Sequence, residues 1–410
     1  MLDYVTNSTF VLTTLLKYNT IGMSGARLAT IIAKLTARIT RAVLVLVAIP
    51  ILSLPRVAEA LETRSFAIYW FGPAFNSQGG DCEGGPNPYL DEQYAKDLVA
   101  LGKTPEEIKA LMKGYLDDNA GGYGFANGHS VRDLMAYRGR IDGKPVDAYA
   151  HPAAVADPKL KALSGKSGYG FNLDGKNSPS AFTDPETGET GVNNQLFRAL
   201  GCFDSMRGTL QHAPASWAFI WSKLREAAPA WLITLSSENL NDDGAVTFTF
   251  DRAIDPLRFD SQGNAWTDVT YRIDPDPRSH HEFRGQRKNG VFTITDHASL
   301  RLLQDPLFTP LFKLEKTHLR LTMMADGSIQ GILGGYQPWS DIYWMLAALH
   351  GEGSIMGDVP GTYYLLRRMA DADPDPSGQN WSISVAYYLQ AVPGFAVPAG
   401  ASARLTASGR

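Results

Sequence analysis

The chain has 410 residues, of which 44% are hydrophobic and 20% are charged, and its formal net charge is −4 at pH 7. This is the composition of an ordinary globular protein with enough apolar material for a core. A mildly acidic chain without a basic run is a poor candidate for nucleic-acid binding, because that binding depends on neutralising phosphates.

Residues 1–60 are typical of an export signal. The apolar run 42–54 follows four basic residues, Arg27, Lys34, Arg38 and Arg41. Ala58-Glu59-Ala60 then fits the small-x-small pattern of signal cleavage sites. The run is short for a transmembrane helix, so we expect cleavage and a periplasmic or secreted protein, with Met23 as an alternative start. An uncleaved membrane anchor is the alternative, and it would be the protein's contact with a membrane.

The chain contains two cysteines, Cys82 and Cys202. Both follow the expected cleavage site, and an exported protein meets an oxidising compartment, so we predict a disulfide between them. Closing so long a loop would stabilise the fold by about 4–5 kcal/mol on the chain-entropy model. Two buried free thiols are the alternative.

The region 61–230 is predicted to be mainly helices and loops. It begins with a short apolar run at 66–71, which predicts a strand. Thr104-Pro105-Glu106-Glu107 is a capping box with proline at the first helical position, which predicts a helix N-terminus. Apolar residues at helical spacing predict two more helices, one ending at Gly102 and one within 216–228.

From Trp231 onward, apolar residues alternate with polar ones, which is the pattern of half-buried strands. Asp326-Gly327 predicts a hairpin turn. Gly334-Gly335 is expected to break the strand that follows, and Trp339 or Ser340 is expected to open a helix.

Several short antiparallel strands joined by turns favour two packed sheets over a parallel sheet. We therefore predict an α+β protein with a helical, loop-rich part at 61–230. An antiparallel β-sandwich of jelly-roll type is expected at 231–397, and a disordered tail at 398–410.

The stretch 168–202 sets acidic and amide residues between glycines and apolar anchors. Its oxygen-bearing side chains include Asn172, Asp174, Asp184, Glu186, Glu189 and Asn193. Calcium takes about six to eight such oxygens on a flexible loop, which predicts a calcium site here. The spacing does not match an EF-hand, and the alternative is that these residues make turns and bond to their own backbone. Asn193 or Asn194 is expected to cap a helix at the end of the stretch.

Two motifs in this stretch, GFNLDG and GVNNQ, are followed by polar turns and strands at 326–346 and 371–392. Together these segments resemble a loosely defined group of uncharacterised exported bacterial proteins with a GxDxDG…GVDNQ-type loop and a C-terminal β-sandwich. Asn172 and Asn193 stand where that loop is expected to have aspartate, which weakens the metal interpretation. The resemblance covers under half of the chain without its signal, and it implies no activity.

Two further groups carry ligand-type side chains. Three aspartates alternate within 371–375, but the glutamate that closes a calcium loop is absent, so a solvated turn is expected. His280, His281 and Glu282 suit zinc, yet no second histidine cluster lies at ligand spacing, so a strand end at the surface is expected.

Catalytic signatures do not stand out in the sequence. The glycine-rich stretch 121–129 lacks the order of a nucleotide-binding loop, and there is no CxxCH motif for haem and no GxSxG elbow. We predict an exported binding or structural protein whose polar loop holds calcium or is tied down by a disulfide. The alternative is an extracellular hydrolase acting on a glycan or ester, with acids from 168–202, so the sequence leaves open whether the protein is an enzyme.

Overall fold

The computed structural model describes nine stretches of the chain, residues 61–100, 102–112, 125–126, 129–130, 135–214, 217–218, 228–303, 311–348 and 357–400. The chain divides into two units, 1–60 and 61–410, and the described residues belong to the second. The expected export signal, most of the helix expected within 216–228 and most of the expected tail lie outside the described residues. Within these stretches, no helix is both long and apolar enough to span a membrane.

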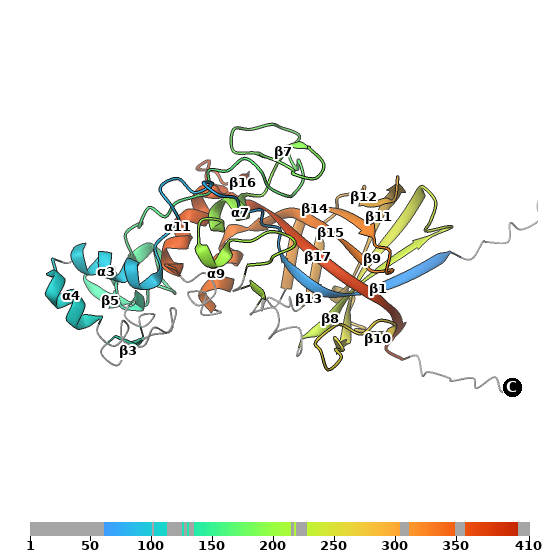
Figure 1. Ribbon diagram of the computed structural model, residues 1–410, viewed down its shortest axis with the longest axis horizontal. Helices are drawn as coiled ribbons and strands as arrows, with labels where there is room; N and C mark the ends of the chain where they lie inside the picture. The colour runs from blue at the N-terminus through green and yellow to red at the C-terminus, as the bar shows by residue number, and fades with distance from the viewer. Residues whose placement is uncertain are drawn as a thin grey trace, which may run out of the picture. The chain divides into compact units, whose positions relative to one another are not determined.

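A closed barrel of eight antiparallel strands dominates the fold (Figure 1). The strands pair in the order β1-β8-β9-β11-β12-β14-β15-β17, and β17 pairs back with β1. Their bounds are β1 (Glu62–Pro73), β8 (Pro229–Ser237), β9 (Gly244–Pro256), β11 (His280–Lys288), β12 (Val291–Ile294), β14 (Leu311–Met323), β15 (Ile329–Pro338) and β17 (Asn380–Pro398). Three further strands extend this sheet, β10 (Val269–Ile273), β13 (Leu300–Leu303) and β16 (Ala372–Pro374).

The predicted sandwich is wrong, although its antiparallel, β-rich character is confirmed. The alternation of apolar residues shows that one face of each strand is buried, and this is equally true of a sandwich and a barrel. Closure depends on β1, which pairs with β8 on one side and with β17 on the other. The alternation beyond Trp231 carries no information about this distant partner.

The interior of the barrel is filled with apolar side chains. Buried residues from its strands form one continuous core, among them Phe66, Ile233, Leu235, Phe248, Phe250, Phe283, Phe292, Leu319, Leu321, Ile329 and Leu389. Burying each such side chain contributes about 1.5–3 kcal/mol. An eight-stranded barrel is only just wide enough to be filled in this way, so its centre is a packed core and ligands are expected only at its ends.

The predicted break at Gly334-Gly335 is also wrong, because β15 continues through both glycines. A Cβ at Gly334 would lie 2.6 Å from the ring of Phe171. The glycine therefore allows the stretch 168–202 to press an aromatic ring against the outside of the barrel.

Short elements make up the rest of the described chain. They are α3 (Leu90–Ala100), α4 (Pro105–Leu111), β2 (Phe125–Ala126), β3 (His129–Ser130), β4 (Gly139–Ile141), β5 (Lys144–Val146), β6 (Phe182–Thr183), β7 (Thr190–Val192), α7 (Gln195–Leu200), α9 (Trp339–Ala348) and α11 (Val359–Met369), with 3-10 turns at Pro152–Ala154, Asp204–Met206 and Pro277–Ser279. The capping box is confirmed, since Thr104 Oγ1 accepts from the Glu107 amide at 3.2 Å and Glu107 Oε2 accepts from the Thr104 amide at 2.8 Å. The helix predicted from Trp339 is confirmed as α9.

The two ends of the barrel differ. At one end, α9 follows β15 directly, and α7, α9 and α11 pack against β17. At the other end, the chain turns between β8 and β9, between β11 and β12, and between β14 and β15 (Figure 1). We call this second end the hairpin end.

The predicted disulfide is confirmed, and it joins Cys82 to Cys202. Cys202 lies just beyond α7 and is fully buried. The bond therefore fastens the coil after β1 to the end of α7.

Candidate functional site

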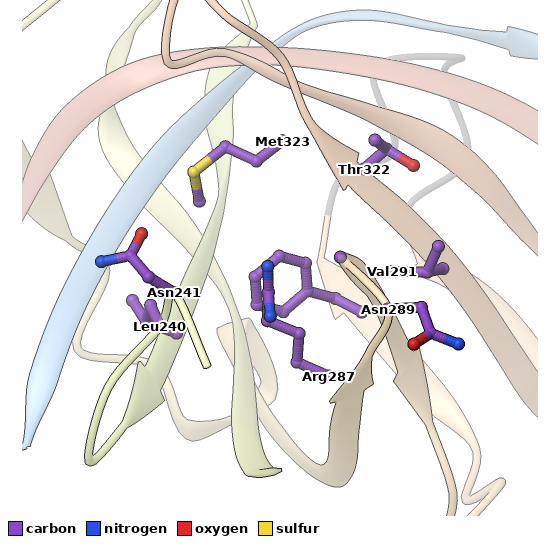
Figure 2. A pocket seen from close by; sticks show the side chains of 9 residues that line it. Leu240, Asn241, Arg287, Asn289, Val291, Thr322 and Met323 are labelled. Atoms are coloured by element: carbon purple, nitrogen blue, oxygen red, sulfur yellow. The ribbon is translucent and has the colours of Figure 1, made fainter. Parts of the chain in front are cut away.

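A cavity of about 250 Å³ lies at the hairpin end (Figure 2). Its lining comes from the β8–β9 turn, the β11–β12 hairpin and the end of β14, and consists of Leu240, Asn241, Arg287, Asn289, Gly290, Val291, Phe292, Thr322 and Met323. These residues span positions 240–323 of the sequence, and two turns and a strand end bring them together. The site is therefore formed by the fold and not by one sequence motif.

A two-residue hairpin forms one side of the cavity. Lys288 pairs with Val291, so Asn289 and Gly290 are the two turn residues. Their φ angles are +51° and +81°, which is the left-handed backbone that a type I′ turn requires at both positions. Asn-Gly is the preferred sequence for this turn, so the dipeptide is a local sequence signal for this hairpin.

The deeper part of the cavity is apolar. Phe292 and Leu240 are each 1% exposed and belong to the barrel core. Met323 packs against that core and is partly buried. A hydrocarbon group entering the cavity would thus leave water and contact this floor.

Arg287 supplies positive charge at the cavity. Position 287 lies on the same face of β11 as the buried Phe283, so its side chain is directed toward the barrel interior. Its Nη1 donates to Asp243 Oδ1 at 3.0 Å, and its guanidinium lies 5.7 Å from the centre of the Phe292 ring. Figure 2 shows Arg287 and Met323 entering the same space from different strands.

A second arginine reaches the cavity wall from β1. Arg64 Nη1 donates to Met323 Sδ at 3.1 Å, and its Nη2 donates to Glu62 Oε1 at 2.5 Å. The other oxygen of Glu62 accepts from the Leu240 amide at 2.8 Å. This amide hydrogen bond, together with Arg64, lowers the pKa of Glu62, so the carboxylate stays ionised and fixes both the turn and the arginine.

The nine lining residues include no carboxylate, histidine or cysteine. They offer hydrogen-bond donors from Arg287 and two asparagines above an apolar floor, so their chemistry is that of binding. Pockets for drug-sized molecules are typically about 300–1,000 Å³. The volume of this cavity therefore suits a smaller molecule.

The residues of the predicted calcium site are mostly engaged by protein donors. Asp184 Oδ1 accepts from the amides of Glu186 and Thr187, and its Oδ2 accepts from Arg320 Nη2 at 2.8 Å. Burial raises the pKa of Asp184, but these hydrogen bonds outweigh burial and hold that pKa below its ordinary value. Glu189 Oε2 lies 4.0 Å from Nη1 of the same arginine.

The remaining predicted ligands are dispersed over several turns. Asn193 Oδ1 accepts from the Leu173 amide at 2.8 Å, and Asp174 Oδ1 accepts from the Lys176 amide at 3.0 Å. The Asn172 side chain donates to the Thr190 carbonyl at 3.4 Å, and Glu186 is hydrogen-bonded to Tyr169.

This arrangement favours the interpretation of 168–202 as turns that bond to their own backbone. Within the described part of the chain, no three His, Cys, Asp or Glu side chains come close enough together to hold a metal ion. Calcium binding stays a prediction. Of the two expected helix caps, Asn194 is the one observed, since its side chain accepts from the Phe197 amide at 3.2 Å.

The two other candidate groups also have structural partners. In the turn after β16, Asp375 Oδ1 accepts from the Ser377 and Gln379 amides. His280 Nδ1 lies 2.7 Å from the buried Asp251 carboxylate, while the ring of His281 packs against Phe283.

Among the acids in the described residues, Asp371 has the clearest effect on how stability depends on pH. Burial raises its pKa to about 6, although Ser384 donates to it through both its amide and its hydroxyl at 2.7 Å. Because the folded-state pKa is raised, the proton stabilises the fold below about pH 4, and this contribution is lost as the pH rises through about 6.

We expect Asp371→Asn to remove this pH dependence. A shift of about two pKa units corresponds to about 3 kcal/mol, so between pH 4 and 7 the wild type should lose up to that much more free energy of unfolding than the variant. Urea denaturation at a series of pH values measures the difference. Parallel curves for the two proteins would contradict the assignment.

Comparison with known proteins gives no match: no family model, no curated protein and no solved structure matches this chain. The resemblance of 168–202 to exported bacterial proteins therefore stays a prediction.

Proposed function

We propose that this protein is an exported binding protein that holds a small, partly apolar molecule at the hairpin end of its barrel. The observation that carries the proposal is the cavity of about 250 Å³, where the inward-directed Arg287 stands above the buried Phe292 and Leu240. Concave sites of this kind, apolar with a few placed polar groups, are typical of ligand pockets, and barrel mouths are among their preferred places.

The packed barrel supports this proposal physically. Below the cavity the interior is closed by buried aromatic and aliphatic side chains, so the floor is preformed and little of it has to be ordered when a ligand binds. Pre-organisation lowers the entropic penalty of binding. A small cavity can therefore still give useful affinity.

The runner-up is a hydrolase that acts on a glycan or ester. A glycan hydrolase typically uses two carboxylates that flank the scissile bond. None of the acids of 168–202 belongs to the cavity lining, and two of them, Asp184 and Glu189, face Arg320. This is why we favour binding.

Occlusion of the cavity tests the proposal. We expect Met323→Trp to place an indole in the space and to weaken binding of small aromatic probes at least tenfold, while Met324→Trp leaves it unchanged. Met324 is the neighbouring residue, is 38% exposed and is not part of the lining, so it is a matched control. Ligand-observed NMR with benzoate, benzamide, benzyl alcohol and benzylammonium measures the binding.

Two outcomes of this experiment would contradict the proposal. One is that none of the four probes binds the wild type. The other is that the probes bind equally to the wild type and to both variants, which would place their site elsewhere on the molecule.

A further inference from the structure

Resting on the proposed function, we infer that the polar end of the ligand is a single carboxylate, and that Arg287 and Arg64 bind it. The guanidinium of Arg287 is part of the cavity lining, and the guanidinium of Arg64 contacts Met323, another lining residue. Guanidinium forks match the geometry of a carboxylate better than any other side chain does.

One N–H group of Arg64 is hydrogen-bonded to a weak acceptor and can change to a stronger one. Its Nη1 donates to the Sδ of Met323, which lines the cavity. A thioether sulfur is a weak hydrogen-bond acceptor, whereas a carboxylate oxygen is a strong one. A carboxylate that enters beside Met323 would therefore replace the sulfur as the partner of this N–H group.

Arg287 also keeps donors for a ligand. Its bond to Asp243 uses Nη1, and a guanidinium has five N–H groups. The side chain of Asp243 is 49% exposed and that of Arg287 is 20% exposed. An ion pair as solvated as this contributes about 0–1 kcal/mol, so a bound carboxylate competes with it easily.

The acids beside the arginines limit how much negative charge the ligand carries. Glu62 pairs with Arg64 and Asp243 pairs with Arg287, so the four side chains sum to zero formal charge. A monoanion gains charge-assisted hydrogen bonds from both arginines. A dianion such as a phosphate monoester would add a second negative charge beside Glu62 and Asp243, which Coulomb repulsion disfavours.

The floor determines the other end of the ligand. The Phe292 ring lies under the Arg287 guanidinium, and Leu240 and Met323 lie beside it in the lining. A compact hydrocarbon group attached to the carboxylate would cover these side chains. The inferred class is therefore a small monocarboxylic acid with a ring or a short branched chain.

The test compares benzoate with benzamide, which has the same shape without the charge, and with phenyl phosphate, which carries more charge. We expect the wild type to bind benzoate about ten- to one-hundredfold more tightly than benzamide, as hydrogen bonds to a charged group imply. Arg287→Gln and Arg64→Gln should each remove most of that preference. Raising the salt concentration should weaken the binding of benzoate but not the binding of benzamide.

Arg272→Gln is the control, because Arg272 on β10 forms its ion pair with Asp255 on β9 and neither residue lines the cavity. It should leave benzoate binding unchanged. Circular dichroism and melting curves of all three variants check that each is folded.

The possible results separate the two proposals. If benzamide or phenyl phosphate binds as tightly as benzoate, and Met323→Trp still abolishes binding, the carboxylate inference is wrong while the binding site stands. If Arg272→Gln weakens benzoate binding as much as Arg287→Gln does, the assignment of carboxylate binding to Arg287 and Arg64 is wrong. If no probe binds the wild type, both proposals fall together.

Discussion

Removing the disulfide is expected to lower the free energy of unfolding by about 4–5 kcal/mol, because the bond closes a loop of 120 residues in the unfolded chain. The variant Cys82→Ala/Cys202→Ala tests this by urea denaturation. The bond also ties the coil after β1 to the end of α7, so its loss should loosen the stretch 168–202 before the barrel unfolds.

Reduction of the wild type provides the control for this prediction. Cys202 is fully buried, so alanine there removes packing as well as the cross-link. The reduced wild type keeps both sulfur atoms and isolates the cross-link. Equal denaturation midpoints for oxidised and reduced wild type would contradict a stabilising role.

Asp358→Ala is expected to lower the free energy of unfolding by about 3–5 kcal/mol, because it breaks a buried ion pair. The Asp358 side chain is fully buried, and its Oδ1 accepts from Arg138 and, at 3.0 Å, from the Gly361 amide. It therefore caps α11 and balances a guanidinium whose side chain is 12% exposed. Its removal leaves Arg138 with the partly exposed Asp97 as its remaining acidic partner at 2.6 Å.

A double-mutant cycle separates the pair from the cap. Arg138→Met removes the charge that Asp358 balances, so Asp358→Ala/Arg138→Met should lose less than the sum of the two single variants. Additive losses would show that the two groups do not stabilise each other. Asp358→Asn keeps a capping oxygen, and we expect it to lower the free energy of unfolding by about 1 kcal/mol less than alanine does.

Local features were predictable from the sequence. The capping box at Thr104 depends on residues three positions apart, and the disulfide prediction depends on there being two cysteines in a chain expected to be exported. The alternation beyond Trp231 correctly indicated antiparallel strands. Each of these signals is contained in a short segment or in the composition.

Barrel closure and the candidate site were not predictable in the same way. Closure requires Ser65 to pair with Gly394, and no local pattern encodes that partner. The cavity combines two turns and the end of β14, so its residues form no single motif. The helix α11 was missed because Pro360 and Gly361 occupy its first turn and resemble a loop, although Asp358 before them is a typical N-cap.

Methionine methyl NMR tests ligand binding at the hairpin end most directly, because Met323 lines the cavity while Met206 is buried elsewhere in the core. The protein carries ten methionines, and Met323→Leu assigns the relevant signal. Titration with benzoate should shift the Met323 methyl resonance to saturation and leave the Met206 resonance in place. A Met323 resonance that does not move, or one that moves no more than that of Met206, would contradict a binding site at this end of the barrel.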